Sequence, residues 1–144
     1  MKKRSAANSI SQKPPEELIF FLDRQLGRHK MAGILRGADL KVEVHDQHLA
    51  QDAPDPEWLA FAGKNNWIVI TRDERIRYRV AEKQAIRRAK VRAFVLAAQG
   101  NLRAETLAEN FLKALPKIRR LVEKEKPPFV AKVSRSGDVN LLQF

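Results

Sequence analysis

Two continuous apolar runs, each followed by an acidic residue, constrain the fold of this chain more than any other feature. Leu18–Leu22 leads directly into Asp23. Trp67–Thr71 leads into Asp73 after a single arginine. Runs of this length without polar alternation are typical of strands buried on both faces, as in parallel sheets covered by helices. Because a carboxylate at such a strand end is costly to bury without compensation, the runs predict a covered sheet with a polar site at one edge.

The rest of the chain alternates between helical and strand patterns. The expected helices are residues 24–36, 55–65, 74–89 and 104–122, and Pro116 is expected to kink or divide the last one. The further expected strands are residues 40–44, 91–98, 129–133 and 139–142, the last two forming a terminal hairpin or an added edge pair. This alternation predicts a mostly parallel sheet with helices on both faces.

Length and composition narrow the class of protein. The 144 residues are expected to form one domain over residues 16–144, after a flexible basic tail over residues 1–15. The chain has no cysteine, which excludes disulfides, thiolate zinc sites and thiol nucleophiles and fits a cytoplasmic location. No apolar run reaches the length of a membrane span, so no membrane partner is expected.

The chain has a formal net charge of +11, and its charges are unevenly distributed. Between Arg72 and Arg92 there are nine basic residues against three acidic ones. This excess favours a polyanionic partner such as a nucleic acid. The candidates for contacts with phosphate groups are Arg72, Arg75, Arg79, Lys83 and Arg87. The last four recur every four residues and would form a basic stripe on a helix, for which a solvated helix face is the alternative interpretation.

The acidic residues near the predicted strand ends allow two interpretations. Asp23, Asp55 and Asp73 each precede a predicted helix, where aspartate commonly caps the first turn, and Glu57 suits a helix N-terminus. Alternatively, these carboxylates converge, since ligands of open parallel sheets bind beyond the carboxyl ends of the strands. Converging carboxylates would suit Mg²⁺ or Mn²⁺. Thr71, two residues before Asp73 on the same strand face, is then a candidate to orient a carboxylate or a bound water.

Three segments resemble, in order and spacing, the PIN-like domains, notably those related to VapC-type toxins. They are residues 20–23 (FFLD), 55–59 (DPEWL) and 67–73 (WIVITRD). The sequence around Arg75-Ile76-Arg77, Glu82, the strand at residues 94–96 and Pro127-Pro128-Phe129 resembles one branch of that group. The resemblance implies a three-layer α/β/α sandwich with a mostly parallel central sheet. It also implies a Mg²⁺- or Mn²⁺-dependent ribonuclease that is paired with an antitoxin protein.

The resemblance further implies roles for individual acids. The matching metal-site positions are Asp23, either Asp55 or Glu57, and Asp73, with Glu82 as a further acid. On this basis the expected activity is hydrolysis of RNA phosphodiester bonds by a water that the metal ion activates. The chain is then expected to be the toxin of a toxin–antitoxin pair, and the apolar faces of its long helix would support a homodimer.

Two other functions are compatible with the same sequence. One is a catalytically inactive nucleic-acid-binding module of the same fold, whose acids only cap helices. The other is a structural subunit whose basic face contacts an acidic protein. Stabilisation by Mn²⁺ or Mg²⁺ would distinguish the ribonuclease from both, because it requires a metal site.

Overall fold

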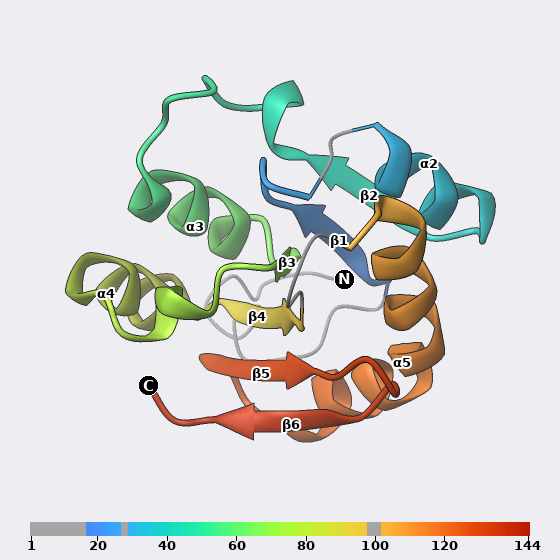
Figure 1. Cartoon of the computed structure of the whole chain (residues 1–144). Coiled ribbons are helices and arrows are strands. Elements are labelled where there is room, and N and C mark those ends of the chain that lie inside the picture. The colour runs from blue at the N-terminus through green and yellow to red at the C-terminus, as the bar shows by residue number, and fades with distance from the viewer. Residues whose placement is uncertain (1–16, 27–28, 98–101) are drawn as a thin grey trace, which may run out of the picture.

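The computed structural model describes residues 17–26, 29–97 and 102–144. Within these residues, six strands form one sheet in the order β2-β1-β3-β4-β5-β6 (Figure 1). They are β1 (Ile19–Leu22), β2 (Lys41–Val44), β3 (Ile68–Thr71), β4 (Arg92–Leu96), β5 (Phe129–Val133) and β6 (Val139–Leu142). All neighbouring strands pair in parallel except β5 and β6, which form an antiparallel pair. The predicted mostly parallel sheet with a terminal hairpin is therefore confirmed.

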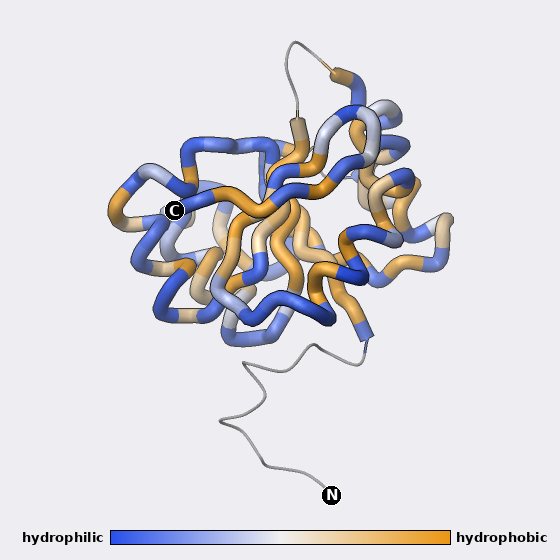
Figure 2. The backbone as a smooth tube through the Cα atoms, turned by 90° about the horizontal axis from the view of Figure 1, so that it is seen from below, coloured by the Kyte–Doolittle hydropathy of each residue, from blue (hydrophilic) through white to orange (hydrophobic). Residues whose placement is uncertain are grey.

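Helices cover both faces of this sheet and complete the predicted α/β/α sandwich (Figure 1). One face carries α2 (Lys30–Gly37) and α5 (Ala104–Lys124), and the other carries α3 (Asp55–Lys64) and α4 (Val80–Ala89). Side chains of successive strand residues alternate between the two layers, so Phe20 and Phe21 belong to different cores. Figure 2 shows the resulting concentration of hydrophobic residues in the central strands. Coverage on both sides explains why the strand runs are apolar at every position.

The first helix begins later than the sequence pattern predicts. It was expected over residues 24–36, whereas α2 begins at Lys30. The residues after β1 form a turn instead, in which Asp23 Oδ1 accepts a hydrogen bond of 2.8 Å from the backbone N–H of Gln25. Short acidic side chains that bond to nearby backbone in this way compete with helix formation.

The basic helix expected over residues 74–89 is divided. A short 3₁₀ helix spans Glu74–Arg77, and α4 follows only at Val80. The Asp73 side chain caps the 3₁₀ helix by accepting a hydrogen bond of 3.0 Å from the backbone N–H of Arg75. The prediction of one continuous basic stripe is therefore wrong, because Arg75 and Arg79 precede α4.

The longest helix is not divided. α5 continues through Pro116 from Ala104 to Lys124, so of the two effects expected of Pro116, a kink or a division, the division is wrong. The basic tail expected over residues 1–15 and the end of the strand expected at residue 98 lie outside the described residues.

The order of the strands reverses between β1 and β3, which makes this a topological switch point of the sheet. The chain passes from β1 to β2 on one side and then returns to β3 on the other side of β1. Asp23 follows β1 and Asp73 follows β3, and both lie at the same edge of the sheet because the two strands are parallel. Ligands bind at such an edge in open α/β sheets.

α3 and α4, which cover the same face of the sheet, approach each other closely at Gly63, near the C-terminal ends of both helices. A Cβ atom at this position would lie 2.6 Å from both the Cβ and the carbonyl oxygen of Ala89. α3 begins with Asp55, and α4 carries Glu82 in its first turn. The contact at Gly63 therefore packs the two helices together at the end opposite to these two acids.

We expect Gly63→Ala to lower the free energy of unfolding by about 1–3 kcal/mol, because the added methyl group forces the two helices apart. Gly33→Ala is a matched control within α2, where an added Cβ has no neighbour within 4 Å. That change should be neutral or stabilise the fold by up to about 1 kcal/mol. Urea unfolding measures both effects, and equal stability of the two variants would contradict the close approach of α3 and α4.

Candidate active site

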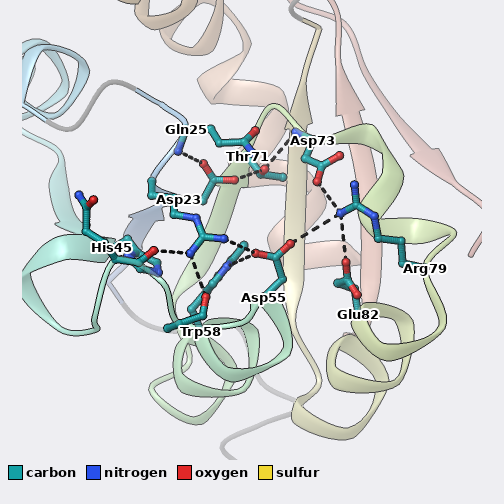
Figure 3. A network of polar contacts seen from close by, with 12 residues as sticks. Asp23, Gln25, His45, Asp55, Trp58, Thr71, Asp73, Arg79 and Glu82 are labelled. Carbon is teal, nitrogen blue, oxygen red and sulfur yellow. Dashed lines mark hydrogen bonds and ion pairs between the residues drawn. The ribbon is translucent and has the colours of Figure 1, made fainter.

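Asp23 is the most buried of the four predicted metal ligands, with 5% of its surface exposed. Its Oδ1 accepts the hydrogen bond from Gln25, and its Oδ2 accepts one from the hydroxyl of Thr71 (Figure 3). Thr71 is fully buried at the end of β3, and its Oγ1 accepts a hydrogen bond of 3.1 Å from the backbone N–H of Asp73. Thr71 therefore fixes the orientation of the Asp23 carboxylate and connects it to the chain beside Asp73.

Burial raises the pKa of Asp23 from its ordinary value of 3.8 to about 6. Hydrogen bonds from Thr71 and Gln25 oppose this rise, whereas the negative charges of Asp55 and Asp73 add to it. At neutral pH the ionised carboxylate therefore lowers the stability of the fold by roughly 3 kcal/mol. A cation bound nearby would offset this cost.

One guanidinium nitrogen lies among the other three acids. Arg79 Nη1 is 2.8 Å from Asp73 Oδ2, 3.1 Å from Glu82 Oε2 and 3.6 Å from Asp55 Oδ2 (Figure 3). Hydrogen bonds to Glu82 and Asp73 raise the pKa of Arg79 above its ordinary value, so the group stays charged. The fold thus brings three carboxylates from the end of β3, from α3 and from α4 around one positive charge.

Two side chains orient Asp55: Trp58 from α3 itself and Arg24 from the turn after β1. Its Oδ1 accepts a hydrogen bond of 2.8 Å from Trp58 Nε1 and lies 3.4 Å from Arg24 Nη2. Arg24 also donates to the carbonyl oxygens of Gln51 and Ala53, at 2.6 and 2.9 Å, and so ties the loop before α3 to the end of β1. The N-cap of α3 is Pro54 and Asp55 is the first helical residue, so the interpretation of Asp55 as the N-cap is wrong.

The two candidates for the middle acid differ in position. Asp55 lies in the acid cluster, where it contacts Arg79. Glu57 is exposed on α3, and in the described parts of the chain no hydrogen bond or ion pair connects it to the other acids. The geometry therefore favours Asp55 over Glu57 as a potential ligand.

A cleft of about 570 Å³ opens beside the acids. Asp55 and Asp73 line it together with both acidic and basic neighbours, which are Glu74, Arg72, Arg75, Arg79 and Lys132. Lys132 on β5 also forms an ion pair of 2.7 Å with Glu74. The cleft is therefore lined both by carboxylates and by cations that suit a phosphate-bearing ligand.

The predicted phosphate-binding residues are divided between this cleft and another surface. Lys83 and Arg87 do not line the cleft. Arg87 instead donates a hydrogen bond of 2.7 Å to the carbonyl oxygen of Phe144 and lies over its ring. Sequence reasoning missed Lys132, although a lysine within the apolar run of β5 was a signal, and it missed Arg24, for which no signal was present.

The oxygen ligands of the four acids suit a hard divalent cation. In the ranges described, however, no three acidic or histidine side chains are close enough to hold a metal ion as they stand. A positively charged group, the guanidinium of Arg79, already lies where Asp55, Asp73 and Glu82 converge. The residues therefore fit a cation chemically, and a metal ion would have to replace the contacts of Arg79.

Comparison with known families gives one match. A family model described as a PIN like domain matches residues 18–98, more than half of the chain. The match contains Asp23, Asp55, Asp73 and Glu82, whereas Lys132 lies beyond it. Searches among curated proteins and solved structures give no match. None of the helices in the described residues is both long and apolar enough to cross a membrane.

We expect Asp23→Asn to raise the free energy of unfolding by about 1–3 kcal/mol at neutral pH in EDTA, because a neutral amide replaces a buried charge. The raised pKa of Asp23 means that the parent chain loses stability as the pH rises from about 4 to about 6. The difference between the two chains should therefore vanish below about pH 4. Urea unfolding across this range measures it, and a less stable variant at neutral pH would refute the cost assigned to Asp23.

Proposed function

This chain belongs to the PIN-like domain family, and we propose that it is a metal-dependent endoribonuclease that hydrolyses RNA phosphodiester bonds. PIN-like domains are typically nucleases, so the family supports hydrolysis of a nucleic acid. The observation that carries the proposal is the gathering of four acids from four segments at the carboxyl ends of β1 and β3. Helix capping alone would not require these carboxylates to converge.

Mg²⁺ or Mn²⁺ is the cofactor that we propose, held by Asp23, Asp55 and Asp73 with Glu82 beside them. Bound there, such an ion supplies an activated water and stabilises negative charge on the phosphate. The protein's own contribution is orientation, since Thr71 fixes one carboxylate and Trp58 with Arg24 fixes another. Side chains locked by such neighbours are preorganised for binding.

The cations around the cleft support a polyanionic substrate. We propose that Arg72, Arg75 and Lys132 contact backbone phosphates on either side of the bond that is cut. Contacts of this kind position a strand but do not read its sequence. RNA is proposed as the substrate on the basis of the resemblance to VapC-type toxins.

The same resemblance supports a role as the toxin of a toxin–antitoxin pair in the cytoplasm. A cognate antitoxin and a second copy of this chain are the protein partners proposed on this basis. Induced expression should then arrest growth, and the Asp23→Asn variant should not. Equal arrest by both chains would argue against toxicity through RNA cleavage.

A specific observation also supports a second function, a catalytically inactive nucleic-acid-binding module. Arg79 already contacts three of the acids, so its guanidinium could replace the metal ion permanently. A metal-dependent enzyme requires that Mn²⁺ raise the melting temperature in a concentration-dependent manner. An unchanged melting temperature, together with RNA binding that EDTA does not affect, would favour the inactive module.

Asp23→Asn, Asp55→Asn and Asp73→Asn should each reduce Mn²⁺-dependent cleavage of total RNA by at least about tenfold, because each removes a charged ligand. Glu57→Gln is the matched control on α3 and should retain full activity, since Glu57 lies outside the acid cluster. Gel analysis of RNA with and without EDTA measures the effect. Full activity of Asp55→Asn with loss in Glu57→Gln would reverse the assignment of the middle ligand.

Arg79→Met should destabilise the metal-free protein and tighten Mn²⁺ binding by about tenfold, because the ion no longer competes with the guanidinium. Arg72→Met is the control for charge, since it removes one cation from the same cleft and no ion pair within the described residues joins Arg72 to the acids. Calorimetric titration with Mn²⁺ measures both variants. Weaker Mn²⁺ binding by Arg79→Met than by the parent would show that Arg79 supports the metal site instead of competing for it.

A further inference from the structure

β6 is an edge strand that lacks the usual protection against pairing with another chain. Within the described residues no strand lies beyond it, as Figure 1 shows at the bottom of the sheet. Its residues Val139–Leu142 include neither a charged side chain nor a proline, and Leu141 is 48% exposed. The opposite edge, β2, carries two charged residues: Lys41 forms an ion pair with Glu17, and Glu43 forms a hydrogen bond with His48. Charged residues of this kind discourage the addition of a strand, so β6 is the more open edge.

A groove of about 470 Å³ runs between this edge and α5. Lys117, Arg120 and Lys124 line it from one face of the helix, as their spacing of three and four residues allows. Lys117 forms an ion pair of 2.9 Å with Asp138, at the start of β6. Arg120 and Lys124 are exposed and have no ion pair in the described part of the chain. The groove thus places two uncompensated positive charges beside an unpaired backbone edge.

We propose that β6 and this groove bind an extended acidic segment of a partner protein, which adds to the sheet as a further strand. The backbone of the segment would pair with β6, as in other cases of strand addition. Alternate side chains of a strand share one face, so acidic residues at alternate positions would lie beside Arg120 and Lys124. The intervening residues of the segment would be apolar and would lie on the opposite face of the sheet, on the side of Leu142.

The same features favour a peptide over RNA. An RNA strand has no backbone that can pair with a strand edge, and the carboxylate of Asp138 repels phosphate groups. None of the residues lining the groove lines the cleft beside Asp55 and Asp73. The proposed docking surface therefore goes beyond RNA cleavage and does not depend on it.

A short synthetic peptide of alternating glutamate and valine, titrated into ¹⁵N-labelled protein, tests the proposal. We expect binding in the submillimolar range, with chemical-shift changes confined to β6 and the second half of α5. Two control peptides should bind at least about tenfold more weakly. One has lysine in place of glutamate, and the other is N-methylated at alternate amides so that it keeps its charge but cannot pair. Failure of the first peptide to bind, or equal binding of the N-methylated peptide, would overturn strand addition.

Matched variants test which residues form the proposed peptide-binding surface. Changing Arg120→Glu together with Lys124→Glu should weaken peptide binding by at least about tenfold, whereas Arg119→Glu, also exposed on α5 but outside the groove, should not. Leu141→Glu adds a negative charge to the exposed edge, which repels the acidic peptide, and should also weaken binding. Metal-dependent RNA cleavage should be unchanged in all three proteins, so a failure of docking can be distinguished from a failure of the proposed activity. Competition by a single-stranded RNA for the same β6 signals in EDTA would identify a nucleic-acid site and overturn the proposal.

Discussion

The cost of burying carboxylate charge is the constraint on which the rest of this structure depends. Asp23 reaches the end of β1 almost without contact with water, where the Thr71 hydroxyl and the backbone amide of Gln25 donate hydrogen bonds to it. Three further acids share the guanidinium of Arg79. Apart from Thr71 in β3, these donors come from irregular segments of the chain, namely the turn after β1 and the break before α4. Departures from regular helix thus compensate charges that a regular fold would leave unsatisfied.

The sheet and the position of its acids could be predicted because they depend on local pattern. Continuous apolar runs identify β1 and β3, and parallel pairing then places Asp23 and Asp73 at one edge. The position of Arg79 could not be predicted in the same way, because a spacing of four residues forms a stripe only on an unbroken helix. The helix is interrupted where the backbone N–H of Arg75 donates a hydrogen bond to the Asp73 side chain and a 3₁₀ helix begins. Long side chains such as Arg24 contact residues far along the chain, and spacing does not encode such contacts.

Capping of a helix and contact with a cationic group, which appear as alternatives in the sequence, occur together at Asp73. Asp73 uses Oδ1 to cap the 3₁₀ helix and Oδ2 to contact Arg79. Asp55 likewise uses Oδ1 for Trp58 and Oδ2 for Arg79. Each carboxylate is therefore oriented by the fold through one oxygen and presents the other to a cation. Asp23 lowers the stability of the fold, and such local conflicts are typical of functional sites.

The strand order has a consequence for how such a protein is made. β1 leaves the ribosome early, but its neighbour β3 follows only after β2 and α3 have been translated. Until then Asp23 has no Thr71 to hold it, and Asp55 has no Arg79. The acids and Arg79 can therefore meet only after β1, β2, β3 and the first turn of α4 have all been synthesised.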